Sequence, residues 1–273
     1  MNNDSAARRY HHPPGDRRSG TPPTRGLIRL AAFLAGILLS STALPATHPP
    51  NSDAEAMVNC PALLTPEPLT PYGFAKATLV SLWYARNAAQ LSADVKKAAH
   101  ETTNPLSFTT ALMRITKLST NDFICAKRSV KPFDVDQSGE NIKTAASFFG
   151  VVYDEHININ QRLIDLLQKM DSISDGERAN EISTLQVERG ERWADLVQPT
   201  GLALMSLVDV ERSDKGKTNR LFITKVQKKA LLDWAREHFP EFKNGTPKAK
   251  WEDPAKTAEL YFTFLNGHKG SDE

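Results

Sequence analysis

The segment DVDQSGENI (Asp134–Ile142) contains side chains whose types and spacing could bind a calcium ion. A calcium-binding loop takes oxygen ligands at its first, third and fifth positions, and glycine at the sixth makes its sharp turn. Counted from Asp134, these positions hold Asp136, Ser138 and Gly139. The three oxygen-bearing residues are therefore the calcium candidates of this sequence.

The second half of the segment departs from that pattern. The twelfth position of a calcium loop holds a bidentate glutamate, and here it is Ala145. Pro132 stands two residues before the loop, where an entering helix would have to end. The alternative interpretation is a polar turn whose side chains cap the following helix, with no metal or cofactor bound.

His156 stands within a run of apolar residues, next to Asp154 and Glu155. A metal site inside a helical bundle would use Glu-x-x-His pairs from facing helices, and this sequence contains none. We therefore predict that His156 is a core residue whose hydrogen bonds fix the helix register. A pH-sensitive packing residue is the alternative, because an imidazole would become charged on acidification.

Other motifs give weaker signals. The tripeptide GKT at 216–218 lacks the glycine and the preceding strand of a phosphate-binding loop. No Gly-x-Ser-x-Gly motif occurs, so an enzyme would belong to a class that the sequence does not identify. A basic cluster is either a solvated face or a contact for anionic lipid or cell-wall polymer. It comprises Lys215, Lys217, Arg220, Lys225, Lys228 and Lys229.

The leader and the remainder of the chain differ in charge. Residues 1–30 hold six arginines and two aspartates, a surplus of four that leaves residues 31–273 at −2 out of a net charge of +2. The basic character therefore belongs to the leader and does not favour a nucleic-acid partner. Residues 27–46 are almost entirely apolar or small, and predict a signal peptide or a membrane anchor. With the arginines on the cytoplasmic side, the remaining chain is exported, either periplasmic or held by one inner-membrane span.

The two cysteines, Cys60 and Cys125, both follow this leader. In an oxidising compartment such a pair predicts a disulfide, which would stabilise the fold by about 4 kcal/mol through the closed loop. Two free thiols are the alternative. No histidine has the spacing that would make the pair half of a zinc site.

The remaining organisation predicts an all-α protein. We expect a disordered basic leader at 1–26, a proline-rich linker at 47–71 and a helical domain at 72–268. Apolar residues from Ile142 to Ile173 alternate in steps of three and four, which predicts one long helix with a coiled-coil-like seam. With a second long helix, kinked at Pro199, it would form an antiparallel hairpin at about 140–173 and 177–210, at the centre of an elongated bundle.

Further helices are predicted at about 72–100 and 104–118, from Thr120, from Thr224 to about His238, and from Pro254 to Gly267. A capping box at 174–177 should start the second hairpin helix, and 211–220 should be an exposed polar loop. No segment alternates with period two, so we expect little or no sheet.

The functional hypothesis is a protein-interaction or structural role in the cell envelope, with another protein or a second copy as partner. It depends on the hairpin presenting more apolar surface than its own two helices can bury. A periplasmic bundle that senses a small ligand or an ion, near His156 or the turn at 134–138, is the second hypothesis. An enzyme is the third.

Overall fold

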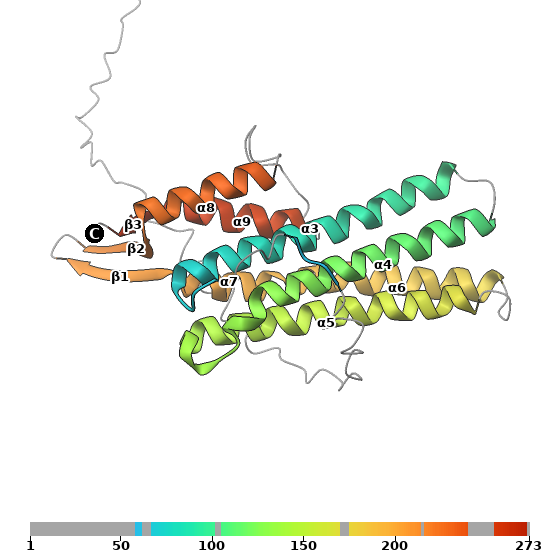
Figure 1. Ribbon diagram of the computed structural model, residues 1–273, viewed down its shortest axis with the longest axis horizontal. Coiled ribbons are helices and arrows are strands. Elements are labelled where there is room, and N and C mark those ends of the chain that lie inside the picture. Colours follow the sequence, from blue (N-terminus) through green and yellow to red (C-terminus); the bar gives the residue numbers. More distant parts are fainter. Residues whose placement is uncertain are drawn as a thin grey trace, which may run out of the picture. The chain divides into compact units, whose positions relative to one another are not determined.

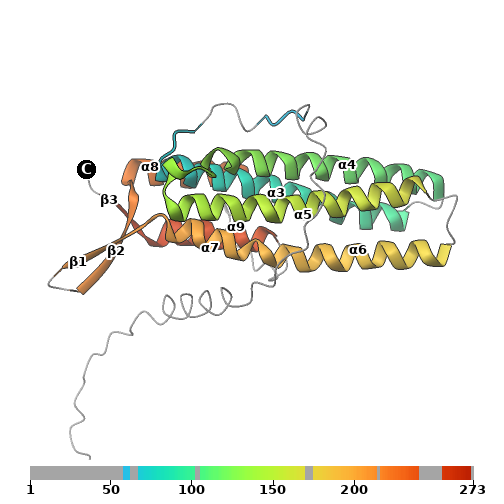
Figure 2. The ribbon, with the colours of Figure 1, turned by 90° about the horizontal axis from the view of Figure 1, so that it is seen from below.

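The computed structural model describes residues 58–61, 67–101, 105–169, 175–213, 216–239 and 254–271. Within these residues the protein is an all-α helical bundle with one small sheet, which confirms the predicted fold class (Figures 1 and 2). The predicted leader and the apolar stretch at 27–46 lie outside the described residues. Among the described helices, none combines the length and the apolar composition that crossing a bilayer requires.

The first two helices are long and neighbouring. Helix α3 spans Pro71–Glu101, and Thr70 caps it by accepting a hydrogen bond from the Gly73 amide, 3.1 Å away. Helix α4 spans Pro105–Val130 without the break predicted near Thr120. The Thr120 hydroxyl donates to the Thr116 carbonyl one turn earlier instead of capping a new helix, so the helix continues.

Two short 3-10 helices, η1 (Lys131–Phe133) and η2 (Asp136–Ser138), lead into α5, which spans Glu140–Gln168. Gly139 is the N-cap of α5, with a positive φ of 82° and no side-chain capping bond. The prediction that polar side chains of this turn cap the helix is therefore wrong. The backbone conformation at this position favours glycine, which has no side-chain acceptor to cap the helix.

The predicted hairpin is present, with corrected ends. Its second arm divides into α6 (Asp175–Asp195) and α7 (Val197–Met205), and residues 170–174, including Ser174 of the predicted capping box, lie outside the described part. The interruption at Leu196 agrees with the predicted kink, because the ring of Pro199 clashes with the carbonyl of residue 195 in a continuous helix. The arm stops at Met205 and not at 210, because the next residues pair in a sheet.

The sheet has the order β1-β2-β3, with β1 at Val208–Ser213, β2 at Gly216–Thr224 and β3 at Lys269–Ser271. β1 and β2 are antiparallel, whereas β3 joins β2 in parallel. The predicted loop at 211–220 is thus a hairpin. Its strands escaped sequence analysis because the hairpin projects from one end of the bundle, so its tip residues show no alternation of apolar and polar side chains (Figures 1 and 2).

The C-terminal helices match their predicted bounds. Helix α8 spans Lys225–His238 and begins with a capping box between Thr224 and Gln227, while α9 spans Pro254–Gly267. Both contact α3 and each other near the sheet (Figure 1). β3 approaches the start of α8 so closely that a Cβ on Gly270 would lie 2.7 Å from the Lys225 nitrogen, which explains glycine at this position.

Helix α5 is central, because α4 packs on one side of it and α6 and α7 on another. The described seam residues are buried from Ile142 to Leu166, as predicted, and Met170 and Ile173 lie outside the description. A second row, from Ala146 through Tyr153 and Ile157 to Leu167, is buried as well. A helix buried over such a wide face belongs to a multi-helix bundle and not to a two-stranded coiled coil.

Candidate functional site: the polar layer and its surroundings

The buried residues form two apolar clusters that a polar layer separates. The large cluster contains Phe123, Tyr153 and Trp193, near the sheet end. The small cluster lies toward the other end of α4, α5 and α6, and contains Leu112, Leu163 and Leu185. Between the two clusters each of these helices carries buried polar residues.

These polar residues form a chain of hydrogen bonds across four helices. Arg189 of α6 donates to the Asn160 side-chain oxygen of α5, and the Asn160 amide donates to Ser119 of α4 over 3.3 Å. Ser119 in turn donates to the Ala88 carbonyl of α3, 3.5 Å away. Arg189 and Asn160 are buried, and burial lowers the pKa of Arg189 to about 10. Buried polar groups joined in this way favour one helix register, because a shifted helix would leave them without hydrogen bonds.

Sequence analysis missed this chain, although a signal was present. Arg189 stands between Leu185 and Trp193, at a place where the apolar spacing of α6 calls for an apolar residue. Asn160 directly follows the seam residue Ile159, on the second buried face of α5. A charged or amide residue in a core register predicts a hydrogen-bonded partner, even when the sequence cannot say which one.

Replacing Asn160 with leucine should lower the free energy of unfolding by about 2 kcal/mol, because the buried guanidinium of Arg189 loses an acceptor. Urea denaturation measures the effect. The matched control is Gln161→Leu, which removes an exposed hydrogen bond to Asp165 on the same helix and should stay within about 0.5 kcal/mol. The double variant Asn160→Leu/Arg189→Met should recover much of the loss; a double variant less stable than Asn160→Leu would contradict this account.

His156 lies beside this layer and is fully buried. Its ring stacks on Phe123, with centroids 4.6 Å apart and planes 2° from parallel, and contacts Trp193 at 4.2 Å. No partner for either ring nitrogen meets hydrogen-bonding geometry among the described residues. His156 is therefore a core residue, as predicted, but aromatic stacking holds it in place and not the predicted hydrogen bonds.

The charged groups near His156 oppose its protonation. Burial, together with the positive charges of Arg189 and Arg192 on α6, lowers the pKa of His156 to about 3, and burial has the largest effect. A backbone contact to Arg192 works in the opposite direction, with less effect. The imidazole is therefore neutral near pH 7.

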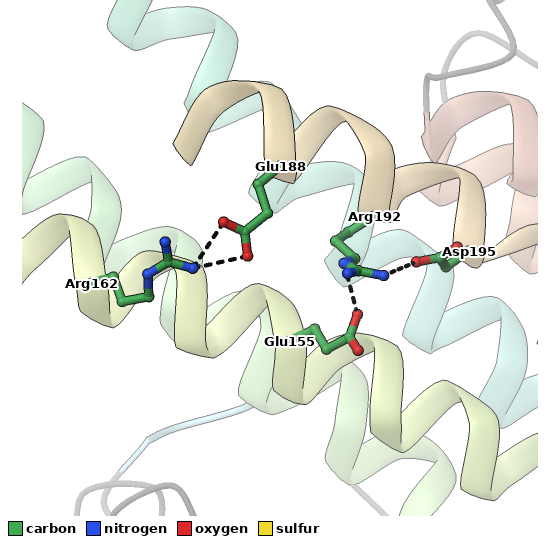
Figure 3. A network of polar contacts seen from close by, with 5 residues as sticks. All are labelled: Glu155, Arg162, Glu188, Arg192 and Asp195. Carbon is green, nitrogen blue, oxygen red and sulfur yellow. Dashed lines mark hydrogen bonds and ion pairs between the residues drawn. The ribbon is translucent and has the colours of Figure 1, made fainter. Parts of the chain in front are cut away.

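Ion pairs join α5 and α6 along the surface of the hairpin (Figure 3). The Arg162 guanidinium donates to both Glu188 oxygens, over 2.9 and 2.8 Å. Arg192 lies between Glu155, 3.1 Å away, and Asp195, also 3.1 Å away. Burial raises the pKa of Glu155 although the Arg192 charge lowers it. These partly exposed pairs orient the two helices more than they stabilise the fold.

The carboxylates among the calcium candidates each pair with a different lysine. Asp134 pairs with Lys131 at 3.3 Å and Asp136 with Lys143 at 2.6 Å, and this lysine lowers the pKa of the Asp136 carboxyl. Ser138 is buried at the end of η2. Within the described residues, no group of three His, Cys, Asp or Glu side chains is placed to hold a metal ion.

Two grooves adjoin α5. The larger, about 560 Å³, lies between α5 and α6, and its lining includes Arg162, Asp165, Glu181 and Leu185. The smaller, about 160 Å³, lies between α4 and α5 and is lined by Lys127, Lys131, Asp134, Ala146, Ser147, Gly150, Val151 and Asp154. His156 lines neither of these grooves, whereas Asp134, from the turn at 134–138, lines the smaller one.

Residues 58–61, a described part of the proline-rich segment, are attached to α4. The Cys60 and Cys125 sulfur atoms are at disulfide-bonding distance, and the two Cα atoms are 5.5 Å apart, as predicted. The Arg128 guanidinium donates to the Val58 carbonyl over 2.7 Å. Cys125 is buried, so the bond anchors this segment directly to the bundle core.

Comparison with known proteins adds no functional information. No family model, no curated protein and no solved structure matches this chain.

Proposed function

We propose that the protein is exported and acts in the cell envelope through contacts with another protein or with a second copy of itself. Its arginine-rich leader, the apolar stretch at 27–46 and the paired cysteines support the location. The sequence predicted that an apolar surface of the hairpin would stay free for such contacts. This prediction needs correction, because α3 and α4 cover that surface. Trp193, a large side chain of the second hairpin arm that could have contributed to such a contact, is buried in the core.

The observation that carries the proposal lies on the exposed surface of α5. Phe148 and Val151 are 37% and 43% exposed, although both are large and apolar. They are three residues apart, so their side chains are neighbours on the helix surface. Val151 also lines the smaller groove, where Lys127 and Asp154 form an ion pair of 2.7 Å. An apolar centre beside charged groups is the composition of a protein–protein interface.

Site-specific photocrosslinking tests this proposal in intact bacterial cells. A photoreactive phenylalanine analogue at Phe148 should form one discrete adduct that fractionates with the envelope, and mass spectrometry would identify the second protein or a dimer. The control position is Gln161, which is exposed on the same helix and distant from the groove. Equal adducts at both positions, or none at Phe148, would contradict the proposal.

The ligand-sensing alternative concerns either groove, because Asp134 of the predicted turn lines the smaller one, but the larger groove, between α5 and α6, has more room. Its charged lining side chains, Arg162, Lys169, Asp165 and Glu181, would suit a small polar ligand. An adduct at Gln161, one helix turn from Asp165, would direct attention to that groove.

A further inference from the structure

We propose that the surface formed by Phe222, Lys225, Val226 and Lys229 binds an anionic lipid bilayer. This surface, the α8 N-terminal surface, joins the end of β2 to the first turn of α8. Phe222 is 54% exposed and Val226 is 79% exposed, and both lysines are exposed. Two exposed apolar side chains next to lysines match the chemistry of a membrane interface, where acyl chains meet phosphate groups.

The local structure fixes this surface. Leu221 and Ile223 face the core with 0% and 1% exposure, so the strand alternation turns Phe222 outward. The capping box then starts α8 at a defined angle: the Gln227 amide donates to the Thr224 hydroxyl over 3.2 Å, and the Thr224 amide donates to the Gln227 side chain over 2.9 Å. Val226 is thus held outward in a rigid first turn.

The charge of the region suits an anionic partner. Residues 208–229 contain seven lysines and arginines against three acidic residues, a surplus of four. The remainder of residues 31–273 is therefore at −6, so the positive charge is concentrated here. β3 adds the exposed Lys269 opposite Arg220, although it is distant in the sequence. The exposed apolar pair favours a bilayer over a soluble polyanion, which would not bury Phe222 and Val226.

The position of the surface is compatible with a membrane-anchored chain. Thirteen residues lie between Ala46, the end of the apolar stretch, and Cys60, which is bonded to α4. An extended chain of that length spans at most about 50 Å. An uncleaved leader would therefore keep the bundle close to the bilayer. This setting rests on the proposed location, but the lipid-binding surface itself does not.

The test uses the full chain reconstituted into vesicles, with an environment-sensitive fluorophore on a new cysteine at Val226. In phosphatidylglycerol vesicles its emission should shift to shorter wavelength and rise at least twofold, and in phosphatidylcholine vesicles it should change little. The matched control is the same fluorophore at Val187, which is 60% exposed on α6. Because the leader is present in both proteins, only contact at the α8 N-terminal surface distinguishes them.

Charge reversal provides the second arm. Lys225→Glu/Lys229→Glu should abolish the response at position 226, and 0.5 M salt should weaken it in the parent. The variant should fold: glutamate at position 225 suits the helix dipole, and Lys229→Glu removes an exposed ion pair with Asp233 that contributes little to stability. Its circular dichroism spectrum checks this. Equal responses at 187 and 226, or a response that survives charge reversal, would overturn the proposal, as would an equal response to soluble polyphosphate. Failure of export or of crosslinking at Phe148 would leave these results unchanged.

Discussion

Replacing Cys60 with serine is expected to lower the free energy of unfolding by about 4 kcal/mol, the largest effect of any single substitution considered for this chain. The bond joins residues 65 positions apart. Its loss restores conformational freedom to a long loop of the unfolded chain, which contains all of α3 and most of α4. Because Cys60 is only partly buried, the substitution leaves the core almost unchanged.

The choice of cysteine matters for the interpretation. Cys125 is 2% exposed, so Cys125→Ala would add the cost of a cavity to the loss of the bond. Urea denaturation of Cys60→Ser and of the reduced parent should give the same free energy within about 1 kcal/mol. A matched control is Arg128→Gln, which removes the bond to the Val58 carbonyl and keeps the disulfide. A Cys60→Ser protein as stable as the oxidised parent would show that the bond contributes nothing.

The sequence predicted correctly those elements that are specified by residues close together in the chain. The capping residue Thr224 predicted the start of α8, and Asp253-Pro254 predicted the start of α9. The apolar spacing in steps of three and four predicted α5. The hairpin arms were predictable for the same reason. The break at Leu196 followed from Pro199, because the effect of proline on a helix acts within one turn.

Features that depend on distant residues were not predictable. β3 contains only three residues, and its pairing with β2 depends on the position of α9. The assignment of Thr120 as a helix start failed because a hydroxyl can either cap a helix or donate to the preceding turn, and the local sequence permits both. The sequence could not show what covers the apolar surface of the hairpin, because α4 packs on it only in the folded protein.

The candidate site shows the same division. Sequence pattern identified His156 as a core residue and the cysteines as a pair. It could not identify Phe123 and Trp193 as the rings that hold His156, because these come from helices on either side of α5. The hydrogen-bond chain through Arg189 and Asn160 also depends on the relative heights of separate helices, which only packing determines.

His156→Leu is expected to remove most of the sensitivity of this core to acid. In the unfolded chain a histidine has a pKa near 6.5, whereas burial lowers that of His156 to about 3. Between these values the unfolded state binds a proton that the folded state does not. The stabilisation that depends on a neutral His156 is therefore fully present above pH 6.5. It decreases as the pH falls toward 3, and the loss is about 3 kcal/mol at pH 4.5.

Carboxyl groups with a raised pKa, Glu155 among them, change the pH profile in the opposite direction. Burial raises the pKa of Asp122 on α4 to about 6, so the folded state takes up this proton before the unfolded state does. Its protonation stabilises the fold as the pH falls below 6. The pH profile of the parent protein therefore combines two opposing effects, and only the difference between the parent and His156→Leu isolates the histidine.

Urea denaturation of both proteins at pH 7 and pH 4.5 gives that difference. At pH 7 the leucine variant should be about as stable as the parent. It exchanges a buried polar ring, whose nitrogens have no partner of good hydrogen-bonding geometry among the described residues, for an apolar side chain of similar size. At pH 4.5 it should be more stable by about 3 kcal/mol. His238→Leu is the control, since that ring is only partly buried and lies 2.9 Å from the Trp234 carbonyl. If His156→Leu and the parent lost equal free energy between the two pH values, the stacked imidazole would not be the acid-sensitive group, and the pH-switch hypothesis would fail with it.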